Sequence, residues 1–167
     1  MKRIFLVGFM ASGKTTTGRR IAKKYNLEFI DLDVYIENRY HKSVSQIFAE
    51  KGEEGFRNIE HNMLQEVAGF EDVVIAAGGG TPCFFNNMDI MNEAGETVYL
   101  KATPEMLCSY LNMNGTAKRP LVANKTPEEL FEYVSTTLAK REPFYEMAKH
   151  SMASDDLSDK LFDELLN

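Results

Sequence analysis

The chain alternates short apolar runs with longer amphipathic stretches. Five apolar runs have the length of buried strands, at residues 4–7, 28–32, 73–77, 97–100 and, more weakly, 150–153. Amphipathic stretches of helical length lie between them, beginning with 15–25. Such alternation predicts an α/β fold, in which a parallel sheet carries helices on both faces and binds its ligands at the carboxyl ends of the strands.

Two segments do not fit this alternation. Residues 33–70 have helical periodicity but no strand, which predicts a small helical insert facing a substrate. Residues 112–125 are polar and contain Gly115 and Pro120, so we expect a long loop there, and over a ligand site such a loop is typical of a mobile lid. The full chain, 1–167, has the length of one ordinary domain.

Composition narrows the classes of function. Hydrophobic residues make up 44% of the chain and charged residues 26%, which are values of a globular protein. The net charge of −6 argues against a broad nucleic-acid or membrane footprint, because such a footprint needs a basic face. Cys83 and Cys108 have neither disulfide nor metal-binding spacing, and no apolar run is long enough for a membrane span. We therefore expect a cytoplasmic protein without nucleic-acid or membrane partners.

Residues 8–15 match the pattern G-x-x-x-x-G-K-[ST] directly after the first predicted strand. Gly8 and Gly13 allow a turn whose N–H groups point inward, and the following helix adds its positive end, so the segment forms a phosphate-binding P-loop. Lys14 can reach the terminal phosphates, and the Thr15 hydroxyl can ligate Mg²⁺. The chain therefore binds a nucleoside triphosphate. The residues predicted to contact it are Gly8, Ala11, Ser12, Gly13, Lys14, Thr15 and Thr16.

The second predicted strand ends in Asp31-Leu32-Asp33. Alternation along a strand places both carboxylates on one side, at the end that faces the P-loop. One of them can then support the magnesium shell while the other receives a proton from an acceptor hydroxyl. The alternative is a pair of solvated turn residues.

Three arginines are candidates for binding anionic groups. Arg57 lies one helical turn before Glu60, which fits either a surface ion pair or a fork for a substrate carboxylate held in place by Glu60. Arg119 lies in the expected lid, where it could fold over the β- and γ-phosphates. Arg141 lies near the end of a long helical stretch that starts near Pro127, where it could equally be a partner of the helix dipole.

Three successive glycines, Gly78, Gly79 and Gly80, follow the third predicted strand. Such a run is costly in backbone entropy and is justified where another group must approach the chain closely. A flexible turn is the alternative.

Taken together, these motifs resemble the shikimate kinase family over essentially the whole chain. The P-loop, the D-x-D, the F-R-x-x-E at 56–60, the three glycines, the R-P-L at 119–121 and the R-E-x-x-Y at 141–145 occur in that family's order and approximate spacing. The resemblance implies a monomeric three-layer α/β/α P-loop kinase with a five-stranded parallel sheet and a closing lid. It also implies transfer of the ATP γ-phosphate to the 3-hydroxyl of shikimate, on the route to chorismate and the aromatic amino acids.

The resemblance also assigns roles to residues of this chain. Lys14 and Arg119 would contact phosphates during catalysis, Thr15 would ligate the single Mg²⁺, and Asp31 would reach that ion through water. Asp33 would hold and deprotonate the acceptor hydroxyl. The remaining substrate contacts implied are Arg57, Gly78, Gly79, Gly80 and Arg141, with Phe48 and Phe56 at apolar positions beside the ring.

Two positions depart from the family pattern. Asn112 stands where many members carry an arginine stacked on adenine, so the adenine contact is weaker or made differently. Ala76 and Ala77 stand where polar residues often precede the three glycines, which removes one contact expected near the metal's water.

Two other functions compete with this assignment. A different small-molecule P-loop kinase, such as a gluconate kinase, would share the P-loop but take another acceptor. A nucleotide-dependent switch would hydrolyse ATP slowly without any acceptor, and would give Arg57 and Arg141 no ligand.

Overall fold

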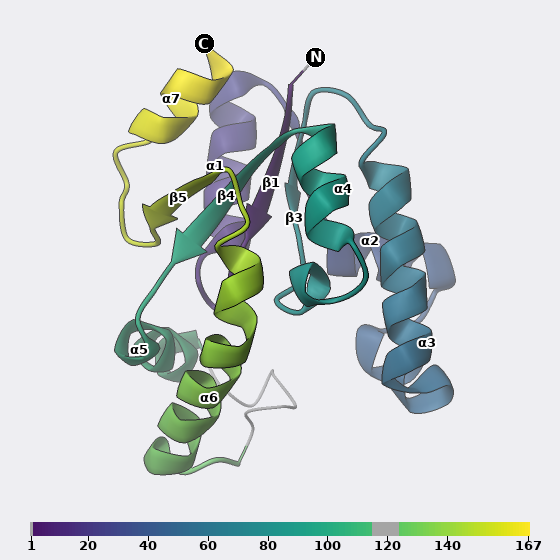
Figure 1. Ribbon diagram of the computed structural model, residues 1–167, viewed down its shortest axis with the longest axis vertical. Helices are drawn as coiled ribbons and strands as arrows, with labels where there is room; N and C mark the ends of the chain where they lie inside the picture. Colours follow the sequence, from purple (N-terminus) through teal and green to yellow (C-terminus); the bar gives the residue numbers. More distant parts are fainter. Residues whose placement is uncertain (1, 115–123) are drawn as a thin grey trace.

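The computed structural model describes residues 2–114 and 124–167. Its centre is a five-stranded sheet in the order β2-β3-β1-β4-β5, and every pair of neighbouring strands is parallel (Figure 1). The strands are β1 (Arg3–Val7), β2 (Glu28–Asp31), β3 (Val73–Ala76), β4 (Glu96–Lys101) and β5 (His150–Ala153). The predicted five-stranded parallel sheet is confirmed.

Helices cover both faces of this sheet, with α4 and α6 in front of it and α1 behind it in Figure 1. The α-helices are α1 (Lys14–Tyr25), α2 (Leu32–Tyr40), α3 (Val44–Val67), α4 (Asn87–Ala94), α5 (Pro104–Asn114), α6 (Pro127–Tyr145) and α7 (Lys160–Leu166), and a 3₁₀ helix, η1, spans Thr81–Cys83. Within the described residues, no helix is both long and apolar enough to cross a membrane. The three-layer α/β/α arrangement is as expected.

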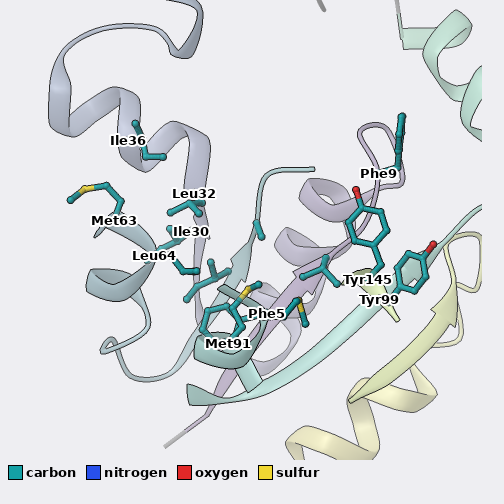
Figure 2. Close-up of a cluster of buried hydrophobic side chains, with 14 of the residues drawn as sticks. Phe5, Phe9, Ile30, Leu32, Ile36, Met63, Leu64, Met91, Tyr99 and Tyr145 are labelled. Atoms are coloured by element: carbon teal, nitrogen blue, oxygen red, sulfur yellow. The ribbon is translucent and has the colours of Figure 1, made fainter. Parts of the chain in front are cut away.

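The alternating side chains of β1 divide the core in two. Phe5 and Val7 pack with α3, α4 and α6, in the larger cluster drawn in part in Figure 2, whereas Ile4 and Leu6 pack with α1 and α7 on the other face. Because β1 is buried on both faces, its sequence is a continuous apolar run, as is usual for a central parallel strand. The central strand thus fixes the P-loop, which follows it, in the middle of the sheet's carboxyl edge.

The segment 33–70 is helical and contains no strand, as predicted. The side chain of Asp31 caps α2 by accepting a hydrogen bond from the Val34 N–H, and Ser43 and Gln46 form a capping box at the start of α3. Gly52, at φ 72°, interrupts α3 with a kink. Helices α2 and α3 pack against each other as a hairpin beside β2, which is the edge strand of the sheet.

Besides shifts of one residue at other element ends, two boundaries near the site differ from the prediction. Strand β2 ends at Asp31, so Leu32 and Asp33 already belong to α2, because the Asp31 side chain caps that helix. Helix α5 continues to Asn114, so the first residues of the expected 112–125 loop are helical. Residues 115–123 of the predicted lid, with Arg119, lie outside the described residues.

Candidate active site

The loop between β1 and α1 has the backbone of a phosphate-binding turn. Gly8 and Gly13 have φ angles of 152° and 93°, and Ala11, at 66°, also has a positive φ. A Cβ on Gly8 would lie 2.9 Å from the carbonyl oxygen of Leu100, so glycine is required there for space as well as for conformation. Ser12 is buried beneath the loop. The predicted strand, glycine turn and helix are all present.

Lys14 begins α1 and lies along the loop. Its Nζ donates hydrogen bonds to the carbonyl oxygens of Gly8 and Phe9, the second at 2.9 Å. The next residue, Thr15, donates its hydroxyl to Asp31 Oδ2 at 3.3 Å, while Asp31 Oδ1 caps α2. The loop thus brings an ammonium group, a hydroxyl and a carboxylate together at one edge of the sheet.

A cavity of about 520 Å³ opens over this loop. Most of the predicted nucleotide and metal residues line it, together with the start of the glycine run. Its walls are Met10, Ala11, Gly13, Lys14, Thr15, Thr16, Asp31, Asp33, Ala76, Ala77, Gly78 and Gly79. Gly8 and Ser12 lie behind this wall, where they shape the loop.

Asp33 reaches this cavity by a route that the sequence did not predict. Asp33 lies in the first turn of α2 and not in a strand. The prediction that Asp31 and Asp33 lie on one side because side chains alternate along a strand was therefore wrong in its reason. The two carboxylates still share the cavity because the helix turns Asp33 back toward the loop. Burial raises the pKa of Asp33 to about 6, helped by the negative charges of Glu60 and Asp31 and opposed by Lys14.

A second cavity of about 370 Å³ adjoins the first. The two share Met10, Asp33, Gly78 and Gly79. The other walls of the second cavity are Glu37, Val44, Ser45, Phe48, Phe56, Arg57, Glu60, Gly80 and Arg141. A group held in the second cavity would therefore meet a phosphate in the first beside Asp33.

Arg57 is fixed in the wall of the second cavity. Its Nη1 lies 2.9 Å from Glu60 Oε1, and Glu60, only 1% exposed, accepts a further hydrogen bond from Thr81 Oγ1 at 2.7 Å. The Phe84 ring lies 4.2 Å from the Arg57 guanidinium carbon. The ion pair therefore joins a buried carboxylate to a partly buried guanidinium and is held on several sides, unlike the surface pair that the sequence also allowed.

Arg141 enters the same cavity from α6. Its guanidinium carbon lies 5.5 Å from the ring centroid of Phe9 in the P-loop. The helix continues through Pro143 to Tyr145, so Arg141 is a full turn before its end and faces the site. The structure thus brings Arg57 and Arg141, far apart in sequence, to one cavity.

The three glycines make room for these side chains. A Cβ on Gly80 would lie 2.5 Å from Arg57 Nη2, and one on Gly79 would lie 3.1 Å from Arg141 Nη1. A Cβ on Gly78 would lie 3.1 Å from Asp33 Oδ1. None of the three has a left-handed φ, so close approach, and not a flexible turn, explains the run.

Sequence reasoning missed several residues of the second cavity. Met10, Val44 and Ser45 carry no signal of their own in the sequence. Glu37 lies four residues after Asp33 and therefore shares its helix face, which could have been noticed. Its Oε2 accepts a hydrogen bond from the Val44 N–H at 2.9 Å and joins α2 to α3.

Comparison with known proteins agrees with this geometry. The family model described as shikimate kinase matches residues 10–167. A shikimate kinase of Phocaeicola vulgatus is 53% identical over 160 residues, covering 96% of this chain and 91% of the relative. The chain belongs to the shikimate kinase family. Membership of the shikimate kinase family makes it an ATP-dependent kinase with an alcohol acceptor.

Solved structures of shikimate kinases have the same fold. The crystal structure of shikimate kinase from Bacteroides thetaiotaomicron is 48% identical, with a TM-score of 0.90, and covers 98% of this chain and 92% of its own. Shikimate kinase from Acinetobacter baumannii, solved in complex with shikimate, is 32% identical, with a TM-score of 0.85 over 99% and 93% of the two chains.

Proposed function

We propose that this protein transfers the γ-phosphoryl group of ATP to the 3-hydroxyl of shikimate, giving shikimate 3-phosphate and ADP. The observation that carries the proposal is the junction of the two cavities. A P-loop cavity adjoins, at Asp33, a second cavity that holds two arginines. This arrangement suits a phosphate donor on one side and a carboxylate-bearing alcohol on the other.

The first cavity would hold ATP. The inward N–H groups of the P-loop and the N-terminus of α1 suit the β- and γ-phosphates. Lys14 would exchange its hydrogen bonds with the loop carbonyls for contacts to those phosphates. We expect this lysine to stabilise the negative charge on the phosphoryl oxygens as it moves between donor and acceptor.

The same cavity fits a magnesium ion bound with ATP. Thr15 Oγ1 and the Asp31 carboxylate are hard oxygen donors 3.3 Å apart. Within the part of the chain that the structure describes, no three acidic, histidine or cysteine residues cluster as a closed metal site. An open site with one hydroxyl, one carboxylate reached through water, and phosphate oxygens is the usual setting for Mg²⁺. When bound, the ion would neutralise charge on the transferring phosphate.

The second cavity would hold shikimate. Arg57 and Arg141 would bind its carboxylate, and the backbone of Gly78, Gly79 and Gly80 would lie against its ring. Asp33, at the junction, would accept the proton of the 3-hydroxyl as that oxygen bonds to the γ-phosphorus. The bond from that phosphorus to the β-phosphate oxygen breaks, and ADP leaves. With a pKa of about 6, Asp33 is ionised at neutral pH and able to take the proton.

Other parts of the assignment stay predictions. Arg119 would reach the β- and γ-phosphates from the lid, 112–125, most of which lies outside the described residues. We also propose that α2 and α3 form the substrate-binding part of a single domain, and that the enzyme works as a cytoplasmic monomer.

A panel of acceptors tests the proposed function. ADP release from MgATP is measured with shikimate, gluconate or a nucleoside monophosphate, and with no acceptor. We expect ADP release to depend on shikimate alone. Equal rates with and without every acceptor would indicate a nucleotide switch, and release driven by gluconate would indicate a different small-molecule kinase.

A further inference from the structure

Tyr145 is the last residue of α6 and is fully buried (0% exposed). Its ring lies 5.2 Å from that of Tyr99 on β4, and Figure 2 shows the two rings side by side beneath Phe9 of the P-loop. Apolar packing alone would be served by phenylalanine, so the hydroxyl calls for a separate explanation. It donates a hydrogen bond to the carbonyl oxygen of Gly79 at 2.5 Å.

Gly79 lies in the wall that the two cavities share. It lines the nucleotide cavity and the second cavity. The place of its missing Cβ lies 3.1 Å from Arg141 Nη1 and 3.5 Å from the backbone nitrogen of Met10 in the P-loop. Gly79 therefore lies between the loop that binds phosphate and the guanidinium that faces the acceptor, and a movement of Gly79 would change its contact with that guanidinium.

Helix α6 holds Gly79 at two points. Arg141 and Tyr145 are four residues apart and so lie on one face of the helix. The Arg141 guanidinium lies beside Gly79, within 3.1 Å of the place of its missing Cβ, while the Tyr145 hydroxyl donates a hydrogen bond to the Gly79 carbonyl oxygen. Burial raises the pKa of Tyr145, so its hydroxyl remains protonated and donates throughout the physiological pH range.

We propose that Tyr145 is a positioning residue, whose hydrogen bond to the Gly79 carbonyl sets the glycine run against Arg141 and so defines the acceptor site. This inference rests on the proposed function. Tyr145 acts through Gly79 and Arg141 and need not touch either substrate. ATP would be held by the N–H groups of the P-loop and by Lys14, whereas Tyr145 bonds to Gly79.

Tyr145→Phe removes the hydroxyl and keeps the buried ring. We expect kcat/KM for shikimate to fall about tenfold, the usual size for one hydrogen bond, mostly through a higher KM for shikimate. The KM for ATP should stay within about twofold, because the P-loop contacts remain. Steady-state kinetics with each substrate varied separately measure the two effects.

Tyr99→Phe is the matched control. Tyr99 is equally buried, and its hydroxyl also bonds to α6, donating to Glu142 Oε2 at 2.7 Å, but makes no such bond to a glycine. This control should leave the KM for shikimate within about twofold while also lowering the melting temperature, since it too removes a hydrogen bond made by a buried tyrosine.

Two results would overturn the inference. One is an unchanged KM for shikimate in Tyr145→Phe. The other is an equal rise in both variants, which would show that the hydroxyls merely support α6. Wild-type protein assayed in parallel separates these results from failure of the proposed function. If the proposed function is wrong, the wild type itself shows no turnover that depends on shikimate, and the inference fails as well.

Discussion

Asp33 shows how the surroundings of one residue select its chemistry. The carboxylate is partly buried beside Glu60 and Asp31, so its ionised form is disfavoured and its pKa rises from 3.8 to about 6. A carboxylate of that pKa is a stronger base than an ordinary surface aspartate, yet it is still ionised at neutral pH. The same surroundings mean that ionised Asp33 lowers the stability of the folded state, so replacing it should change the free energy of unfolding as well as the activity.

Replacing Asp33 by asparagine should therefore lower activity and raise stability. The variant cannot accept a proton, so turnover should fall by roughly 10²–10⁴, while the KM for MgATP stays within a few-fold. The unfolded chain loses its proton near pH 4 and the folded chain near pH 6, so ionised Asp33 destabilises the fold increasingly across this interval. At about 1.36 kcal/mol per pKa unit, and with some solvent screening, we expect a gain of about 1–3 kcal/mol above pH 6.

Denaturant unfolding of wild type and variant at pH 4 and pH 7 measures the gain, which should be small at the lower pH. Glu71→Gln, an exposed carboxylate outside both cavities, serves as the control and should change neither activity nor stability. If Asp33→Asn keeps near wild-type turnover, Asp33 is not the base. If added magnesium restores its turnover, Asp33 belongs to the metal shell and Asp31 is the hydroxyl partner.

Among the elements, the glycine run after β3 sets the geometry of the acceptor site. Gly80 has helical backbone angles, φ −93° and ψ −11°, that alanine adopts without strain. Because Gly80 has no Cβ, the Arg57 guanidinium can lie against it, where Glu60 and Phe84 hold that guanidinium in place. A methyl group at Gly80 would therefore displace the Arg57 guanidinium without straining the backbone.

Gly80→Ala should therefore raise the KM for shikimate by about 10–100-fold with little change in the KM for ATP, because a misplaced guanidinium weakens only the acceptor. Gly69→Ala is the control, since a Cβ there meets nothing nearer than 3.5 Å and should leave both constants unchanged. Kinetics with each substrate varied in turn separate the outcomes. An equal loss for both substrates would mean that Gly80 supports the whole fold.

The elements themselves were largely predictable from the sequence. The five strands follow from apolar runs, and α6 follows from Thr126 and Glu129, which cap it, and from Pro127 at its start. The end of β2 was harder, because the choice between strand and helix at Leu32 depends on the Asp31 side chain capping α2. Gly52 also kinks α3, within a segment for which the sequence predicted only helical periodicity.

At the scale of the whole molecule, the sheet order determines which residues meet. Strand β1 lies between β3 and β4, so the P-loop lies next to the glycine run that follows β3. No local pattern fixes that order, which is why the sequence could name Arg57 and Arg141 but could not show that both face one cavity. Tyr145 was visible in the R-E-x-x-Y motif, yet its bond to Gly79 required the structure.

Positively charged side chains face the two cavities although the protein as a whole is acidic. The protein carries a net charge of −6, yet Lys14, Arg57 and Arg141 face the two joined cavities. These three side chains, with the magnesium ion that we propose, would offset the charge of ATP and of a carboxylate acceptor. An acidic surface elsewhere is compatible with this, since the local field of a cleft is set by the groups that line it.

The most direct test of the central claim is the identity of the product. The protein is incubated with MgATP and shikimate, and phosphorus and proton NMR locate the new phosphate ester while ADP is quantified. Asp33 lies where the two cavities meet, so transfer of one phosphoryl group there should give one ADP per ester. From membership of the shikimate kinase family we expect a single product with the phosphate on the 3-oxygen. Esters on other oxygens, or ADP and inorganic phosphate without an ester, would contradict the account.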